Sequence, residues 1–353
     1  MLIQATGLTH RVEGAFSEGY ILIAPVWGQD AYLINKAGEI AHSWRTGPRM
    51  TSWCYMRPGG RLFINERSEN ARGVELSGSG IMREYDWDGN IVWEHIDPWQ
   101  HHDARRLETG GVVYIAYREM AHAEQTRVKG GVAGSETERG MFGEVIREVD
   151  VDGNVVWEWD FANFGPGQFP LHDNANRWSA GHPNTIQILA NGDYLICSKA
   201  LNLIFRIDRQ TSQVVWYFQD DEMGGPHDAQ MMDNGNILVF ANGTFGSDLL
   251  YSQVWEIDSK TKEIVWRYVA KTNPMSFFSP HISGCERLAN GNTLICEGAR
   301  GCVFETTPDR DVVWEYVSPF FADHALFNQV NWPFRARHAT SDSAEIEGRL
   351  DGA

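Results

Sequence analysis

The sequence lacks any run of Lys or Arg and any long apolar stretch. Its 30 Lys and Arg stand against 47 Asp and Glu, which gives a formal net charge of −17. So acidic a chain repels phosphate backbones and anionic lipid headgroups, and we therefore expect neither nucleic acid nor a membrane surface as a partner. No apolar stretch reaches the ~18 residues that a membrane-spanning helix needs.

Cysteine is also scarce. The five cysteines are odd in number and none forms a CxxC pair, which argues against a zinc or redox motif of that kind. The start of the chain shows no basic end followed by a hydrophobic run, the pattern of an export signal. We therefore predict a cytoplasmic protein whose cysteines serve as small buried hydrophobic residues.

Tryptophan, by contrast, is abundant and regularly placed. Six of the 14 tryptophans close the same apolar phrase, as in Asn154-Val155-Val156-Trp157. These six are Trp44, Trp93, Trp157, Trp216, Trp266 and Trp314. A second phrase, a turn glycine before an apolar run, alternates with the first at Gly19, Gly59, Gly110, Gly192, Gly235 and Gly291. Self-similarity at this spacing, with several short strands per unit, is typical of a propeller or a solenoid.

Hairpin turns of the Asp-x-Asp-Gly type lie between the two phrases, so each unit reads as four antiparallel strands. We predict an all-β, six-bladed β-propeller as a single domain over residues 1–340, followed by a loose tail at 341–353. Residues 332–338 would supply the innermost strand of the first blade and close the propeller. The Trp of each fourth strand would pack between neighbouring blades. The long segments 67–80 and 118–143 are predicted to form lids or rims.

The histidines concentrate where the innermost strands are expected. His102 and His227 each lie eight residues before a turn glycine, and His182 and His281 lie ten before one. Because strand side chains alternate with period two, all four belong to the same strand face. His338 belongs to the proposed closing strand. Such a convergence of imidazoles favours a functional site over a set of structural hydrogen bonds. Asp103 and Asp228 could orient a ring nitrogen or accept backbone N–H groups.

At this point the sequence resembles the arylsulfotransferases, six-bladed propeller enzymes that move a sulfuryl group between phenols through a histidine. The resemblance rests on the repeated phrases, on residues 182–186 (His-Pro-Asn-Thr-Ile), and on His227-Asp228 with residues 240–243 (Phe-Ala-Asn-Gly). It implies that His227 is the sulfated nucleophile and that His102 and His182 support it. Lys199 stands where the family has an arginine, so a bidentate clamp becomes a point charge.

The resemblance implies an aromatic small-molecule substrate and no cofactor, and we add a set of substrate-binding candidates: His281, Arg335, Arg337 and His338. An alternative is a metal-dependent lyase or hydrolase in which a divalent transition metal is held by three or four of His102, His182, His227, His281 and His338. A non-enzymatic interaction platform would explain the repeats but would leave the histidines without a task.

Overall fold

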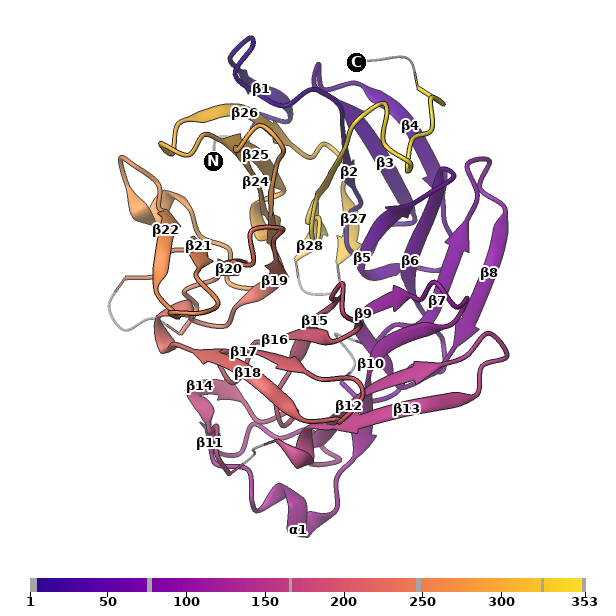
Figure 1. Cartoon of the computed structure of the whole chain (residues 1–353), viewed down its shortest axis with the longest axis vertical. Coiled ribbons are helices and arrows are strands. Elements are labelled where there is room, and N and C mark those ends of the chain that lie inside the picture. Colours follow the sequence, from indigo (N-terminus) through magenta and orange to yellow (C-terminus); the bar gives the residue numbers. More distant parts are fainter. Residues whose placement is uncertain (1–4, 75–77, 165–166, 246–248, 325–326, 351–353) are drawn as a thin grey trace. The chain divides into compact units, whose positions relative to one another are not determined.

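The computed structural model describes residues 5–74, 78–164, 167–245, 249–324 and 327–350 (Figure 1). The chain is 48% strand and 5% helix, and the prediction of an all-β, six-bladed β-propeller is confirmed. The only α-helix among the described residues is the short α1 (His122–Gln125). No helix there is long and apolar enough to cross a membrane. The residues separate into two compact units, which we describe one at a time.

The first unit comprises Met1–Arg67, Met82–Glu94 and Tyr268–Ala353. It holds the first and sixth blades and most of the second. In sheet order their strands are β29 (Arg337–Ala339), β2 (Tyr20–Ile23), β3 (Asp30–Asn35) and β4 (Ile40–Arg45); β5 (Met50–Arg57), β6 (Arg61–Arg67), β7 (Gly80–Tyr85) and β8 (Ile91–Ile96); and β23 (Gly284–Arg287), β24 (Thr293–Glu297), β25 (Cys302–Thr306), β26 (Val312–Val317) and β1 (Gly7–Arg11).

The second unit comprises Ser68–Ile81 and His95–Arg267 and holds the third, fourth and fifth blades. Their strands in sheet order are β9 (Gln100–Arg106), β10 (Val112–Glu119), β12 (Phe142–Val149) and β13 (Val155–Asp160); β15 (Pro183–Ile188), β16 (Tyr194–Ser198), β17 (Leu203–Ile207) and β18 (Val214–Gln219); and β19 (His227–Met231), β20 (Ile237–Ala241), β21 (Gln253–Ile257) and β22 (Ile264–Tyr268). The last residue of β22, Tyr268, belongs to the first unit.

The predicted closure by a C-terminal strand is confirmed, although the strand comprises Arg337–Ala339 rather than residues 332–338. β29 pairs antiparallel with β2, with Ile21 opposite His338. Gly19 precedes β2 with a φ of +126°, and a Cβ there would lie 2.5 Å from the carbonyl oxygen of Ala339. The turn glycine of the first blade is therefore required by the close approach of the closing strand.

Four of the six repeat tryptophans join neighbouring blades, as predicted. The indole Nε1 of Trp157, on the third blade, donates to Oγ of Ser212 in the hairpin turn of the fourth. Trp216, on the fourth blade, donates in the same way to the carbonyl of Ser259 in the fifth. Trp44 and Trp314 make the equivalent bonds in the first unit, to the carbonyl oxygens of Asp86 and Lys36. A buried indole needs such an acceptor, which explains why Trp recurs at this position.

Several smaller segments complete the fold. The predicted lid at 118–143 contains α1 and β11 (Gly130–Val132), which pairs in parallel with β14 (Leu171–Asn176). In the segment 67–80, residues 75–77 lie outside the described residues. A hairpin of β27 (Ala322–His324) and β28 (Asn328–Val330) precedes the closing strand.

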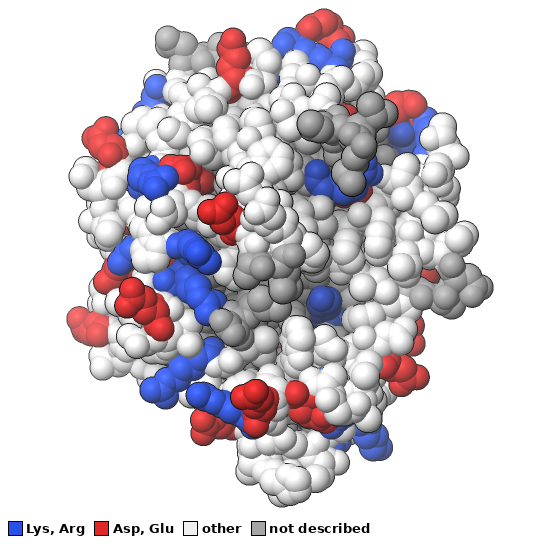
Figure 2. Space-filling view, turned by 180° about the vertical axis from the view of Figure 1, so that it is seen from behind, with Lys and Arg blue, Asp and Glu red and all other residues white. Residues whose placement is uncertain are grey.

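The segment expected to be a tail makes contacts as far as it is described, to residue 350. Ile346 is fully buried in the core of the first and second blades. The amide of Gly59 donates to the carbonyl of Ala344. All five cysteines are buried and free, as the sequence indicated. On the face drawn in Figure 2, acidic and basic side chains are interspersed among uncharged ones.

Candidate active site

The three histidines of the matched phrases come from the first strands of three consecutive blades. His102 lies in β9, His182 immediately precedes β15, and His227 begins β19. β15 lies against both β9 and β19, which brings the three positions to one place within the second unit. Lys199 follows β16, and its amide donates to the carbonyl of His182 at 3.0 Å.

The backbone around these residues departs from regular strand geometry. His102 and His182 both have a φ of +52°, and Asp228 has a φ of +58°. In each of the three blades the pairing of the first two strands also shifts register at this point. A left-handed backbone is uncommon in residues other than glycine, and such strain concentrates at functional sites. Bulges of this kind re-aim side chains.

His101, His102 and His182 form a chain of touching rings. Nδ1 of His101 and Nδ1 of His102 are 2.7 Å apart, and the rings of His102 and His182 are edge to face with centroids 4.7 Å apart. His101 is fully buried and stacks on Tyr117 at 3.7 Å. Sequence reasoning did not select His101, because the alternation of strand side chains assigns it to the opposite face from His102.

The hydrogen bond between the two histidines indicates where their protons lie. Nε2 of His101 is buried and has no hydrogen-bond partner among the described residues. A buried N–H without an acceptor is costly, so this nitrogen is better left as a lone pair. The proton of His101 then lies on Nδ1 and is donated to Nδ1 of His102. In neutral His102 the remaining proton is therefore on Nε2, which makes that atom a donor.

In His227 the ring proton lies on the other nitrogen, Nδ1. Its Nδ1 lies 3.1 Å from the carbonyl oxygen of Gly225 and 2.8 Å from Oδ1 of Asn242. A carbonyl oxygen can only accept, so Nδ1 carries the proton of the neutral ring. Nε2 of His227 consequently holds the lone pair. Asn242, in the Asn-Gly phrase that follows β20, thus orients the imidazole, a role that the sequence had left open for Asp228.

The two aspartates next to the histidines have other contacts. Oδ2 of Asp103 accepts the backbone N–H of Ile186 at 2.9 Å, which links β9 to β15. Oδ2 of Asp228 accepts from the amide of Gln230. Of the two roles considered for Asp103, the structure therefore shows the acceptance of a backbone N–H.

Burial lowers the pKa values of basic groups in the site. The pKa of His182 is well below its usual range because of burial first, and then because of the nearby His102 and Lys199. Burial and His102 do the same to the pKa of His101. Burial also lowers the pKa of Lys199 to about 8, so its ammonium is still mostly charged at neutral pH. His101 and His182 are thus neutral at pH 7 beside the ammonium of Lys199.

Two further neighbours were not foreseen. A Cβ at Gly225 would lie 3.2 Å from Cγ of Lys199, so the absence of a side chain there leaves room for the lysine. Glu144, on β12, is fully buried and accepts the backbone N–H of His182 on Oε1 at 2.9 Å. Burial raises the pKa of Glu144 to about 7. Nothing in the spacing of the sequence distinguishes Glu144 from the other acidic residues of the repeats.

The remaining candidates belong to the first unit. The guanidinium carbons of Arg335 and Arg337 lie 4.5 and 5.1 Å from the centroid of the Trp53 ring. His281 lies edge-on to Trp332, with ring centroids 4.9 Å apart. Trp53 and Trp332 belong to one hydrophobic cluster of this unit, and both Trp53 and Arg335 are buried. That this cluster shares a pocket with the histidines of the second unit stays a prediction.

His338 has a mainly structural environment. Its backbone belongs to the closing strand β29, and its Nε2 lies 2.8 Å from the carbonyl oxygen of Glu18. Burial lowers its pKa. Nothing in these contacts assigns His338 to substrate rather than to the closure.

Comparison with known proteins decides the family. The sequence matches the model of the arylsulfotransferase (ASST) family over residues 70–319, most of the chain. The chain belongs to this family. Membership supports an arylsulfotransferase-like function in general. A search of curated sequences gives no match.

Two solved structures share the propeller fold with this arylsulfotransferase family member. A protein of unknown function from Bacteroides caccae has 16% identity and a TM-score of 0.56, covering 91% of this chain and 98% of that one. A streptogramin B lyase has 13% identity and a TM-score of 0.50, covering 89% of this chain and 83% of the lyase. At such low identity these likenesses concern the fold alone.

Proposed function

We propose that the protein transfers a sulfuryl group from an aryl sulfate to a phenolic acceptor, with His227 as the covalent carrier. The observation that carries the proposal is the fixed tautomer of His227. Its Nδ1–H is held by Gly225 and Asn242, so Nε2 carries the lone pair that a nucleophile needs. Membership of the arylsulfotransferase family supports the same reaction.

The two steps follow from this arrangement. In the first, Nε2 of His227 forms a bond to sulfur while the bond from sulfur to the aryl oxygen breaks, and the phenolate leaves and takes up a proton from water. In the second, the oxygen of an acceptor phenol attacks the sulfur and its proton passes to water, while the bond from sulfur to Nε2 breaks and restores the free imidazole. No oxidant, reductant or cofactor is needed for either step.

The neighbouring groups have complementary tasks. Nε2–H of His102 can donate to the departing phenolate oxygen or to a sulfuryl oxygen. The ammonium of Lys199 offsets the charge that grows on the sulfuryl oxygens. His182 lies within electrostatic reach of His102, Lys199 and His227. We retain Arg335, Arg337 and His281 as candidates for recognition of the aromatic ring and its sulfate.

The metal-dependent lyase or hydrolase is the weaker candidate. Within the described residues, no three His, Cys, Asp or Glu side chains are arranged to hold a metal ion. The Nδ1 atoms of His101, His102 and His227 are also engaged in hydrogen bonds. A metal would therefore have to be held through the outer nitrogens of rings that now touch edge to face.

His227→Ala tests the proposal. We expect it to abolish the release of phenol from an aryl sulfate, whereas His122→Ala, on the exposed helix α1, should retain full activity. Wild-type protein mixed with aryl sulfate and no acceptor should gain the mass of one sulfuryl group, which acid then removes from His227. A wild-type level of turnover in His227→Ala, or a sulfuryl group on another residue, would overturn the assignment.

A further inference from the structure

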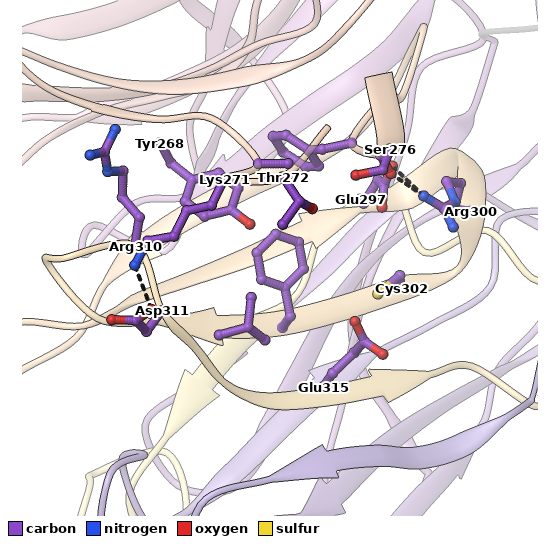
Figure 3. Close-up of a pocket in the computed structure, with 14 residues that line it drawn as sticks. Tyr268, Lys271, Thr272, Ser276, Glu297, Arg300, Cys302, Arg310, Asp311 and Glu315 are labelled. Atoms are coloured by element: carbon purple, nitrogen blue, oxygen red, sulfur yellow. Dashed lines mark hydrogen bonds and ion pairs between the residues drawn. The ribbon is translucent and has the colours of Figure 1, made fainter. Parts of the chain in front are cut away.

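A second candidate site lies on the sixth blade, within the first unit. A cavity of about 430 Å³ opens there between the end of β22, the segment after it and the face of β24, β25 and β26 (Figure 3). Neither the repeat pattern nor the sulfuryl-transfer proposal uses it. Its lining combines aromatic rings, three carboxyl groups and a few basic side chains.

Three aromatic rings form its apolar wall. The ring centroids of Tyr268, Phe277 and Phe304 are 5.3, 5.5 and 5.7 Å apart in pairs. All three residues belong to the lining. Such a wall suits a flat or aliphatic body, and ring faces attract a cation.

Glu297 supplies a buried carboxyl group. Its side chain is 4% exposed. Oε1 accepts the backbone N–H of Phe278 at 2.7 Å and lies 3.5 Å from Nη1 of Arg300. Oε2 has no partner within the part of the chain that the structure describes. An oxygen that no protein donor engages can accept a hydrogen bond from a ligand in the cavity, and the low exposure of the Glu297 side chain strengthens such a bond.

Glu315, on β26, adds another carboxyl group to the lining of the cavity. Its Oε1 accepts from the hydroxyl of Thr9 at 2.6 Å. Burial first, and then the charges of Glu315 and Glu297, keep the pKa of the Cys302 thiol well above its usual range. The inner end of the cavity is therefore acidic.

The basic residues lie at the rim. Lys271 is paired with Asp311, and the guanidinium of Arg300 donates to the carbonyl of Ser276. Arg300 is 44% exposed, in contrast to Glu297. Lys271, Arg300 and Asp311 are thus exposed at the mouth, whereas Glu297 is buried.

We propose that this cavity binds an organic cation, an ammonium or amidinium group on an apolar body, anchored by Glu297 and Glu315. The positive group reaches the acidic inner end and donates to Oε2 of Glu297. The apolar body lies against the wall of Tyr268, Phe277 and Phe304.

Three probes of similar size test the charge requirement in the full-length protein. Isothermal titration at pH 8 compares 2-phenylethylamine, 2-phenylethanol and 3-phenylpropionate. We expect saturable binding of the amine, weaker binding of the alcohol and none of the carboxylate. Equal binding of amine and alcohol, preference for the carboxylate, or no binding of any probe would each overturn the proposal.

Four variants test the anchors. Glu297→Gln keeps the size of the side chain and should weaken amine binding at least ~10-fold, and Glu315→Gln should weaken it several-fold. Glu263→Gln removes the same charge from an exposed turn and should leave binding unchanged. Arg300→Met removes the competing cation and should strengthen binding. If Glu297→Gln does not fold, the variants Glu315→Gln and Arg300→Met still test the site, because both residues are partly exposed. Unchanged amine affinity in both variants would refute the site.

The pH dependence gives a further check. Glu297 is faced by Tyr268 from β22, Arg300 after β24, Cys302 from β25 and Glu315 from β26. Burial raises the pKa of Glu297 to about 7. The amine needs the ionised carboxylate, so its affinity should fall about 10-fold between pH 8 and pH 6 in wild-type protein. Glu297→Gln should not show this change.

Discussion

Lys199 makes the sulfuryl-transfer proposal sensitive to alkaline pH in a specific way. Burial lowers its pKa to about 8, so the ammonium is charged below that pH and is lost above it. If this charge stabilises the sulfuryl oxygens, kcat/KM for the first half-reaction should be constant near pH 7 and decline above pH 8. The decline should approach about 10-fold per pH unit, the limit for loss of one required proton.

Two substitutions separate the charge from the side chain. Lys199→Arg keeps a cation that does not deprotonate in this range, so the alkaline decline should disappear even if the plateau is lower. Lys199→Met should lose about 100-fold at pH 7, which corresponds to about 2.7 kcal/mol of transition-state stabilisation, and its profile should be flat near pH 8.

The assay is the initial burst of phenol released from an aryl sulfate without an acceptor, which avoids the titration of an acceptor phenol. Lys260→Arg, an exposed lysine in the fifth blade, is the matched control and should keep the wild-type profile. An alkaline decline that persists in Lys199→Arg would show that another group causes it. Full activity in Lys199→Met would refute the role of the ammonium altogether.

Two further residues give predictions that need only one variant each. Asn242→Leu removes an acceptor from Nδ1 of His227, and the loss of tautomer control should lower kcat about 10- to 100-fold with little change in KM; an unchanged kcat would show that Gly225 suffices. Glu144→Gln removes a carboxyl group whose pKa is raised from 4.5 to about 7 by burial. Because the folded state holds this proton more tightly, the free energy of unfolding of the wild type should fall by about 3 kcal/mol as pH rises from about 4.5 to 7. Denaturant unfolding of Glu144→Gln should lack that part of the decline. Parallel pH profiles of the two proteins would contradict this prediction.

The blades could be predicted from the sequence because each repeats the same physical requirements. A turn glycine, a hairpin of Asp and Gly, and an indole that donates to the next blade recur at steady spacing, as Trp157 and Trp216 show. The fifth strand of the sixth blade, β1, was not predicted. It begins before the first repeat, and it pairs with β26 in a position that no other blade fills within the described residues.

The site was predicted in part, for a reason that lies in the backbone. The spacing to the turn glycines selected His102, His182, His227 and His281, and the structure brings the first three together in the second unit. His101 was not selected, yet beside the left-handed φ of His102 the Nδ1 atoms of the two rings lie 2.7 Å apart. A local departure from strand geometry cannot be seen in spacing, and it is here that the unforeseen contact occurs.

The polarity of the imidazoles follows from groups that carry no charge. Nδ1 of His227 donates to a carbonyl oxygen and an amide oxygen, and Nδ1 of His102 accepts a hydrogen bond from His101. The first arrangement leaves a lone pair on Nε2, and the second leaves an N–H on Nε2. An aspartate in either place would favour the imidazolium and so remove the nucleophilic lone pair from part of the population. Uncharged hydrogen-bond partners thus leave a lone pair on Nε2 of His227 and an N–H on Nε2 of His102, next to the ammonium of Lys199. In the proposed reaction the first would be the nucleophile, the second a hydrogen-bond donor and the third a positive charge for the sulfuryl oxygens.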